Sequence, residues 1–317
     1  MKEKHLARIY LLEAIREFFK TKNFLDVLTP PAVQNPGMEA HIHPYALWKT
    51  RENKLDDLYL HTSPEFCMKE LLSEGLENIF TLSYVFRDEP KSEVHRRQFI
   101  MLEWYRKEVS YQQIMKDCQE LFNFCSTYLK EKGVPTVAPV EIKKYTIQEI
   151  FKKTLNIDIL NYLETKTLRK LIEDKFPEVP LPKEKLTWDD LYFLLFLNKI
   201  EPKLIGKSPW LLFEFPHHLS AYSTLKKEDP RVCERFEIYW QGLELGNCFN
   251  ELTDPVEQKN RLQKQSELKQ NIYNYSLPKP TKFIAVMDKG LPTSAGIAMG
   301  VERLLLALTG ISNPFWD

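Results

Sequence analysis

Two pairs of strand-like segments in this chain follow each other directly, without a helix between them. Residues 79–88 and 98–106 are separated only by a charged stretch, and residues 234–251 form one run around Gln241 and Gly242. Strands joined in this way pair antiparallel, whereas parallel strands need a long crossover connection. Because helix-like segments flank both pairs, the sequence predicts an α+β fold in which helices cover an antiparallel sheet.

Apolar residues recur at helical or strand spacing in most of the remaining chain. Residues 3–20 are expected to form an amphipathic helix, and residues 24–31 a short apolar strand that two prolines end. Further elements are expected as follows: strands at 58–62 and 211–216, helices from Pro64, at 111–129 and at 255–272, and a strand that turns into a helix at 294–308. Residues 140–205 give several helices with proline-rich joints, and we interpret them as a helical insertion in a single domain that spans residues 1–317.

Charge and cysteine content exclude several classes of protein. The 317 residues carry 44 Lys+Arg and 44 Asp+Glu, so the chain lacks the overall positive charge of a typical nucleic-acid binder. The sequence contains neither GxGxxG nor a Walker-type loop, so a nucleotide would have to be held by other means. No membrane span and no secretory signal are expected, and five cysteines without a CxxC pattern fit a reducing compartment. We therefore expect a cytoplasmic protein without a structural zinc site.

Chemically active side chains alternate onto one face of the first strand pair. On an extended strand Arg87 and Glu89 share a face, and on the partner strand Phe99, Glu103 and Tyr105 do so. One sheet surface can therefore bring together an arginine, two carboxylates and two aromatic rings. The alternative is a solvated sheet face with cross-strand ion pairs.

The second strand pair places two carboxylates at the spacing of a cation site. A two-residue turn at Gln241 and Gly242 pairs Tyr239 with Glu244, so Glu237 and Glu244 lie diagonally on one face, roughly 7–8 Å apart at the backbone. Two carboxylates at this spacing can hold a Mg²⁺ ion that keeps several waters. A bulge at Gly246 would turn three further residues onto that face. These residues are Asn247, Phe249 and Glu251.

The segment 294–308 is a strand bracketed by glycines that continues into a helix with Arg303 in its first turn. A helix N-terminus and a guanidinium group together can hold phosphate oxygens. The alternative is an ordinary helix start with a Glu302–Arg303 pair and glycines that serve helix packing.

Three segments resemble the sequence motifs of class II aminoacyl-tRNA synthetases, in the order and spacing of that family. Phe24–Pro30 resembles motif 1, Phe86–Tyr105 resembles motif 2, and Gly296–Arg303 resembles motif 3. Within the class, Ser63-Pro-Glu65 and Glu234–Asp254 are similar to the lysyl branch. The similarity is greatest to the shorter lysyl-tRNA synthetase paralogues, which attach lysine or (R)-β-lysine to a lysine side chain of elongation factor P.

This resemblance covers essentially the whole chain and implies both an activity and partners. It implies a class II catalytic domain without an anticodon-binding domain, and an AMP-forming ligase that uses ATP and Mg²⁺ and forms a lysyl adenylate. The implied partners are elongation factor P as acceptor, lysine or (R)-β-lysine, and a second copy of the chain in a homodimer. A tRNA acceptor and a membrane are not expected.

The resemblance also implies roles for individual residues. Arg87 and Arg303 are expected to be catalytic, because they would stabilise charge on the phosphates. Residues expected to contact ATP are Arg87, Glu89, His95, Phe99, Glu244, Leu245, Gly300 and Arg303. Residues expected to hold Mg²⁺ are Glu237 and Glu244. Residues expected to form the amino-acid pocket are Ser63, Pro64, Glu65, Glu103, Tyr105, Asn247, Phe249, Glu251 and Ala298.

Charge and shape indicate which guest this pocket would take. Three carboxylates around a small cavity are destabilised unless a guest with two ammonium groups neutralises them. Ala298 stands where lysyl-tRNA synthetases have glycine, so its methyl group would crowd an α-amino group and favour a β-amino acid.

Two other functions remain open from the sequence. One is adenylate chemistry with a tRNA or a small molecule as acceptor, and the other is a non-catalytic synthetase-like module that senses an amino acid or regulates a partner. Four histidines and two helical cysteines lie outside the motifs, and we expect them to be structural. They are His41, His43, His217, His218, Cys118 and Cys125.

Overall fold

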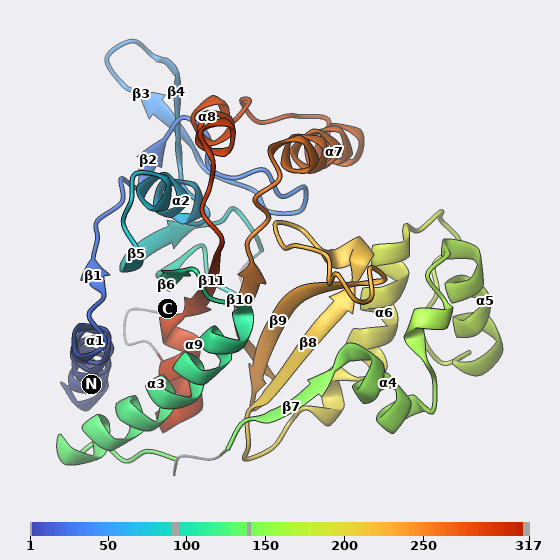
Figure 1. Ribbon diagram of the computed structural model, residues 1–317, viewed down its shortest axis with the longest axis horizontal. Helices are drawn as coiled ribbons and strands as arrows, with labels where there is room; N and C mark the ends of the chain where they lie inside the picture. The colour runs from blue at the N-terminus through green and yellow to red at the C-terminus, as the bar shows by residue number, and fades with distance from the viewer. Residues whose placement is uncertain (1, 91–94, 138–140, 313–317) are drawn as a thin grey trace. The chain divides into compact units, whose positions relative to one another are not determined.

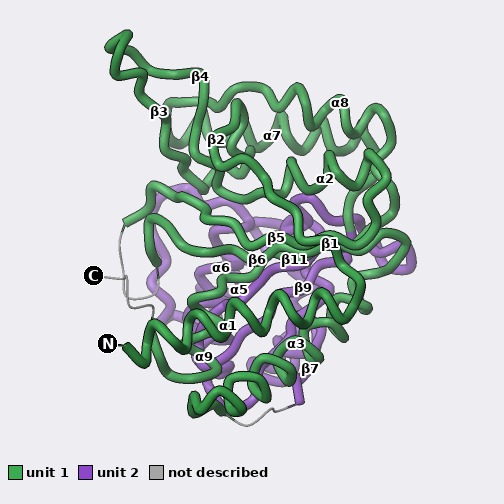
Figure 2. The backbone as a smooth tube through the Cα atoms, turned by 90° about the vertical axis from the view of Figure 1, so that its left-hand side faces the viewer, with its two compact units in different colours: residues 1–139, 251–317 green, residues 140–250 purple. Residues whose placement is uncertain are grey.

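The computed structural model describes residues 2–90, 95–137 and 141–312 (Figure 1). Its contacts divide the chain into two compact units, residues 1–139 with 251–317 and residues 140–250 (Figure 2). The predicted α+β class is confirmed, since each unit combines helices with strands that are mainly antiparallel. A single catalytic domain stays a prediction.

The sheet of unit 1 is built on the predicted central strand pair. The strand order is β1 (Leu25–Asp26), β5 (Asn78–Phe86), β6 (Gln98–Lys107) and β11 (Ser294–Gly300). β5 and β11 both pair antiparallel with β6, and only β1 is parallel to its neighbour β5. Residues 91–94 of the expected connecting loop lie outside the described residues. A separate sheet has the order β2 (Ala32–Val33), β4 (Lys54–Leu60) and β3 (Ala46–Lys49).

Six helices of unit 1, within the described residues, accompany these strands. They are α1 (Lys2–Thr21), α2 (Glu65–Ser73), α3 (Tyr111–Glu131), α7 (Pro255–Tyr273), α8 (Thr281–Lys289) and α9 (Val301–Thr309). α1 packs on α3, α2 packs on α8, and α9 contacts β6. Phe19 of α1 stacks on Phe80 of β5 with ring centroids 4.6 Å apart, which fixes that helix to the sheet. α8 is a helix that the sequence reasoning did not find.

Four details of unit 1 differ from the sequence predictions. The strand expected at 24–31 shrinks to two residues, because two prolines remove donors and Leu28 is 90% exposed rather than buried. Ile9 is one of the apolar residues at helical spacing in the expected helix 3–20, yet it is 45% exposed, since the buried stripe of α1 runs through other residues. Pro64 is the N-cap of α2 and not its first residue. β5 ends at Phe86, so residues 87–89 lie beyond the strand on which a shared face was expected.

Unit 2 has its own strands and its own core. The strand order is β10 (Leu243–Asn250), β9 (Val232–Trp240), β8 (Trp210–Pro216) and β7 (Lys143–Thr146), and only the β7–β8 pair is parallel. Its helices are α4 (Ile147–Leu155), α5 (Thr165–Lys175) and α6 (Trp188–Lys199), with 3-10 turns η1 (Ile159–Asn161), η2 (Glu201–Lys203) and η3 (His217–Leu219). Buried Phe151, Leu191 and Tyr192 belong to one apolar cluster that joins these helices to β8 and β9. The helices of this unit lie within the segment expected to be a helical insertion.

The β9–β10 hairpin has the predicted turn and the predicted bulge. Gln241 and Gly242 both have positive φ, 53° and 78°, as a two-residue hairpin turn with the favoured twist requires. Tyr239 faces Glu244, but Glu237 faces Asn247, so the register shifts by one residue between Glu244 and Gly246. The extra residue turns the following part of β10 over, which confirms the effect expected of a bulge here.

Candidate active site

Arg87 and Phe99 lie side by side at one end of the β5–β6 pair. Arg87 directly follows the last residue of β5, and Phe99 is the second residue of β6. The Arg87 backbone NH donates to the carbonyl of Arg97 at 2.9 Å, so pairing continues one residue past β5. The Arg87 guanidinium lies 5.4 Å from the centroid of the Phe99 ring and its Nε donates to the carbonyl of Thr62 at 3.4 Å. A fixed guanidinium beside a half-buried aromatic ring is suited to a phosphate and a stacked base.

The expected phosphate-binding residues of unit 1 also lie near one another. Burial and the neighbouring guanidinium of Arg303 lower the pKa of His95, and Glu89 acts on it in the opposite direction. Arg303 is in the first turn of α9, and its side chain lies beside the N-cap residue Gly300. The structure therefore brings Arg87, Glu89, His95 and Arg303 into one neighbourhood.

Glu302 anchors this helix to the strand that carries Phe99. Its two carboxylate oxygens accept from the backbone NH of Ile100 at 3.1 and 3.0 Å, and the side chain is buried. Glu302 therefore does more than form the ordinary pair with Arg303 that the sequence alternative describes. This contact fixes the position of α9, and with it that of Arg303, relative to β6.

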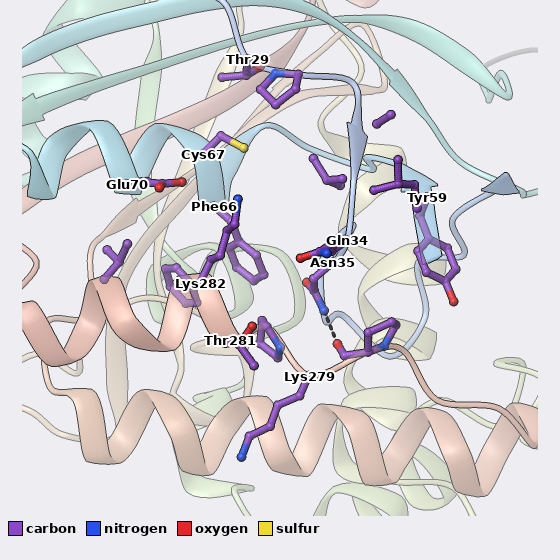
Figure 3. Close-up of a pocket in the computed structure, with 18 of the residues that line it drawn as sticks. Thr29, Gln34, Asn35, Tyr59, Phe66, Cys67, Glu70, Lys279, Thr281 and Lys282 are labelled. Carbon is purple, nitrogen blue, oxygen red and sulfur yellow. Dashed lines mark hydrogen bonds between the residues drawn. The ribbon is translucent and has the colours of Figure 1, made fainter. Parts of the chain in front are cut away.

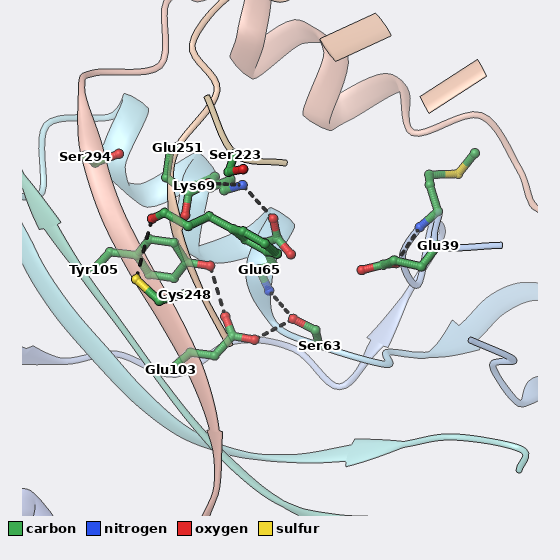
Figure 4. Close-up of polar contacts among 12 residues, drawn as sticks. Glu39, Ser63, Glu65, Lys69, Glu103, Tyr105, Ser223, Cys248, Glu251 and Ser294 are labelled. Carbon is green, nitrogen blue, oxygen red and sulfur yellow. Dashed lines mark hydrogen bonds and ion pairs between the residues drawn. The ribbon is translucent and has the colours of Figure 1, made fainter. Parts of the chain in front are cut away.

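A buried network of polar side chains fills the other end of the same strands (Figure 4). Ser63 donates to Glu103 at 2.5 Å, and the hydroxyl of Tyr105 donates to the other oxygen of Glu103 at 3.2 Å. Ser63 also accepts from the backbone NH of Glu65 at 3.1 Å, at the start that Pro64 gives to α2. These four residues of the expected amino-acid pocket are therefore joined in one hydrogen-bonded group.

Lys69 completes this network and was missed by the sequence reasoning. Its ammonium lies 2.5 Å from Glu65 and 2.6 Å from Glu251, and only 1% of the side chain is exposed. Burial alone would lower the pKa of Lys69, but the carboxylates of Glu251 and Glu65 raise it above its ordinary value. The sequence reasoning assumed that only a guest would neutralise the three carboxylates. That assumption is wrong, because the ammonium group of Lys69 already forms ion pairs with two of them.

The carboxyl groups of the network remain poised to accept positive charge. Burial and the nearby Glu65 raise the pKa of Glu103 to about 8. Burial also raises the pKa of Glu251 to about 8, although Lys69 acts in the opposite direction. Burial and Glu103 raise the pKa of the Tyr105 hydroxyl well above its ordinary value, so it stays a donor. A cationic guest would favour the ionised carboxylates and gain strong hydrogen bonds.

Glu39 is a partly buried carboxyl group that the sequence did not single out. It lies in the loop before β3 and lines a cavity of about 20 Å³ together with Ser63 and Glu65. Burial and the charge of Glu65 raise its pKa, while Arg87 acts in the opposite direction. It therefore lies between the expected nucleotide and amino-acid residues of unit 1.

β11 shapes the pocket through two small residues. Gly296 faces Tyr105 and Ala298 faces Glu103 in the β6–β11 pairing, so both lie on the face of the network. A β-carbon at Gly296 would lie 2.2 Å from two carbons of the Tyr105 ring. Glycine at this position is therefore what admits the tyrosine, a role that motif spacing alone did not indicate.

The expected site residues of unit 2 gather around Arg235. It forms an ion pair with Glu237 and donates to Asn247 at 3.0 Å, and its guanidinium lies 5.5 Å from the ring of Phe249. The hydroxyl of Tyr239 donates to Glu237 at 2.5 Å. The bulge at Leu245 brings Glu244, Asn247 and Phe249 onto one face.

This donor set fits a Mg²⁺ ion that keeps other oxygen ligands. Each oxygen of Glu237 already accepts one hydrogen bond, which leaves further lone pairs on the carboxylate. Glu237 and Glu244 together carry two negative charges, and the positive charge of Arg235 offsets one of them. One negative charge is then left for the cation. Within the described residues no group of three or more His, Cys, Asp or Glu side chains could hold a metal by itself. The pair therefore fits a cation shared with phosphate oxygens rather than an all-protein site.

The residues expected to be structural have structural environments. His41 and His43 contact the hydroxyls of Tyr273 and Tyr275 at 2.9 and 2.5 Å, and His218 stacks on Trp188 with ring centroids 4.1 Å apart. Cys118 and Cys125 are both fully buried in α3. In the part of the chain described, no helix is long and apolar enough to cross a membrane.

A cavity of about 760 Å³ lies on the other side of α2 and contains none of the sequence-predicted site residues (Figure 3). Phe66, Cys67 and Glu70 of α2 line one wall, and Lys279 and Lys282 line the opposite one. Asn35 spans the rim with a hydrogen bond to the carbonyl of Pro278. The size of this cavity does not make it the candidate active site, because the converging carboxylates and arginines lie elsewhere.

Comparison with known proteins decides the family. A family model described as tRNA synthetases class II (D, K and N) matches residues 1–313. The chain belongs to the class II tRNA synthetase family. It is 33% identical to the elongation factor P–(R)-β-lysine ligase of Histophilus somni (strain 2336), over 97% of this chain and 91% of that protein.

Two further relatives carry the same name. The ligase of Pseudoalteromonas translucida is 32% identical over 96% of this chain and 91% of its own, and that of Haemophilus influenzae is 29% identical over 95% and 90%. The resemblance to class II synthetases and to this paralogue group is therefore confirmed. As a class II synthetase relative of named ligases, the chain is an ATP-dependent ligase.

Proposed function

We propose that this ligase activates lysine or (R)-β-lysine with ATP and transfers it to a lysine side chain of elongation factor P. The observation that carries the proposal is the buried Ser63–Glu103–Tyr105 network, which offers carboxylates to an ammonium group. Arg87 donates to the carbonyl of Thr62, the residue before Ser63. The backbone segment that carries Ser63 therefore also contacts Arg87, which is proposed to bind the nucleotide. The names of the curated relatives support the acceptor and the amino acid.

In the first step an oxygen of the amino-acid carboxylate attacks the α-phosphorus of ATP, and the bond to the β-phosphate oxygen breaks. Arg87 offsets charge on the α-phosphate, and Phe99 stacks on the adenine, which Glu89 also faces. His95 and Arg303 hold the outer phosphates as pyrophosphate leaves, with Gly300 and Leu245 contributing backbone contacts. Catalysis rests on positioning and electrostatics, with no protein nucleophile.

Glu237 and Glu244 hold the Mg²⁺ ion in this proposal. Bound there, the ion would supply positive charge to the triphosphate. The ion pair between Arg235 and Glu237 keeps that carboxylate in place without a metal. Asn247 and Phe249, which contact the same arginine, take part in amino-acid binding.

In the second step the amine of the acceptor lysine attacks the adenylate carbonyl, a new amide bond forms, and AMP leaves. The substrate ammonium groups stay bound by Glu65, Glu103 and Glu251, which fixes the carbonyl for attack. Because ATP and a translation factor are the substrates, the reaction belongs to the cytoplasm. We further propose that the ligase acts as a homodimer, which light scattering of the purified chain would test.

Ala298 sets the choice between the two amino acids in this proposal. It faces Glu103 across the β6–β11 pair, where its methyl group would crowd a substrate α-amino group. Ala298→Gly is expected to raise the rate of α-lysine activation. Unchanged activation of α-lysine by that variant would contradict this role.

Intact mass of elongation factor P tests the whole proposal. The purified factor is incubated with this protein, ATP, Mg²⁺ and either lysine or (R)-β-lysine. A lysyl-sized increase that requires ATP would support the ligase and identify its amino acid. Amino-acid-dependent ATP–pyrophosphate exchange without a mass increase would favour a tRNA or small-molecule acceptor, and loss of both would favour a regulatory module.

A further inference from the structure

Lys69 is a buried ammonium in the amino-acid network to which the proposed function assigns no role. It lies on α2 one turn after Glu65, and its side chain is 1% exposed. Its Nζ is 2.5 Å from an oxygen of Glu65 and 2.6 Å from an oxygen of Glu251 (Figure 4). The ring of Phe283 on α8 lies 5.8 Å away and closes the apolar side.

The two carboxylates come from separate parts of unit 1, so Lys69 is what holds them together. Glu65 begins α2, whereas Glu251 is the residue that follows β10. A buried carboxylate that loses its only ion-pair partner takes up a proton rather than stay charged. Without Lys69 the two carboxylates would lose the ammonium group that holds them in place, and Glu251 would ionise less readily.

The charge count of the network matches the guest of the proposed function. Three carboxylates, Glu65, Glu103 and Glu251, face one ammonium, so the fully ionised network has two negative charges in excess. Lysine and β-lysine each carry two ammonium groups. The other groups near these carboxylates leave this excess unchanged, since Ser63 and Tyr105 are neutral donors to Glu103 and the charges of Glu39 and Arg87 oppose each other.

We propose that Lys69 is a positioning residue for amino-acid recognition: it orients Glu65 and Glu251 and favours the ionised form of Glu251, so that the network can present two negative charges when a substrate with two ammonium groups binds. This inference rests on the proposed function and deepens it. Lys69 acts through the two carboxylates and does not itself contact the substrate.

Amino-acid-dependent ATP–pyrophosphate exchange at several pH values tests the inference. Lys69→Met is expected to raise the KM for the diamino acid on the order of 100-fold at pH 7 with little change in the KM for ATP. Because Glu251 would then ionise only at higher pH, the fall of amino-acid KM with rising pH should move upward by at least about one pH unit. If Lys69 had only a structural role, Lys69→Met would not shift the pH dependence of the amino-acid KM.

Two further variants separate charge from packing. Lys69→Arg keeps the positive charge, so it should restore the amino-acid KM to within about tenfold of the unmodified protein and leave the pH dependence in place. Lys226→Met is the matched control, because Lys226 also lies 2.5 Å from a glutamate, Glu214, but outside the network. Lys226→Met should change neither the amino-acid KM nor its pH dependence.

Each outcome bears on the inference. An active unmodified protein with an unchanged amino-acid KM in Lys69→Met would overturn the role of Lys69 and leave the proposed function intact. If the unmodified protein shows no exchange with lysine or β-lysine, the proposed function and this inference both fail. If Lys69→Met does not fold, Lys69→Gln with Glu251→Gln removes one charge of each sign, and an unchanged amino-acid KM in that double variant would overturn the inference.

Discussion

Gly296 lies directly opposite Tyr105 in the pairing of β11 with β6, so close that an added β-carbon would stand 2.2 Å from two carbons of the ring. The same ring carries the hydroxyl that donates to Glu103 at 3.2 Å. Gly296→Ala should therefore displace Tyr105, lower the free energy of unfolding by about 1–3 kcal/mol and raise the amino-acid KM by about tenfold or more. Urea unfolding and pyrophosphate exchange measure the two effects.

Gly206→Ala is the matched control for this substitution. Among the residues that the structure describes, apart from Gly206 and its two chain neighbours, no atom lies within 4 Å of a β-carbon added there. The control should change neither stability nor amino-acid KM appreciably. If Gly296→Ala binds the amino acid as tightly as the unmodified protein, Tyr105 does not contribute to the pocket.

The sequence predicts the strands of the site better than the charges between them. The pairing of residues 79–88 with 98–106 and the bulge near Gly246 could be predicted, because turn residues and strand alternation are local properties. Lys69 could not, since a lysine in a helix is ordinarily exposed and its contact with Glu251 depends on tertiary packing. The available signal was its position four residues after Glu65, between the buried Met68 and Leu72.

Other misses have similar physical causes. α8 follows a proline-rich segment, and its nine residues are too few for a clear apolar period. Glu39 is in a loop, where neither helical nor strand spacing indicates which side chains are buried. The sequence reasoning considered Glu302 only as a partner of Arg303 at the helix start, because its bond to the backbone of Ile100 depends on how α9 meets β6.

The pH dependence of stability should report the buried carboxyl groups. The pKa of Glu103 and of Glu251 is about 8 in the folded protein, above the ordinary value of 4.5. The folded state therefore holds more protons than the unfolded state between these values, so the free energy of unfolding should fall as pH rises from about 4.5 to 8 and level off above. Glu103→Gln should make this slope shallower in urea unfolding series.

Glu131→Gln is the control for that slope, because Glu131 is exposed at the end of α3. It should leave the slope unchanged. A stability that rises with pH through this window, or an equal slope in Glu103→Gln, would contradict the raised pKa of Glu103.

Binding of the diamino acid should release protons near neutral pH. An ammonium group favours the ionised form of Glu103 and Glu251, whose pKa values of about 8 then fall. Calorimetry in two buffers with different ionisation enthalpies measures the number of protons released. Proton uptake at pH 7 would show that the guest does not neutralise these carboxylates.

Glu302 should control both stability and nucleotide binding. Glu302→Ala leaves the buried NH of Ile100 without its carboxylate acceptor, so it should cost about 1–3 kcal/mol and raise the KM for ATP through the neighbouring Arg303. Glu302→Gln keeps an oxygen acceptor and should be milder in both respects. Equal effects of the two substitutions on the KM for ATP would mean that charge at this position, rather than anchoring of α9, is what matters.

The two carboxylates of the β9–β10 hairpin should differ in what their removal does. Glu237 is the ion-pair partner of the buried Arg235, so Glu237→Gln should lower stability as well as raise the Mg²⁺ concentration needed for half-maximal exchange. Glu244 is only partly buried, so Glu244→Gln should raise the Mg²⁺ requirement by about tenfold with little change in urea unfolding. An unchanged Mg²⁺ dependence in Glu244→Gln would exclude this pair as the metal site. Glu237 is the member of the pair that would remain, and Arg235 already neutralises its charge.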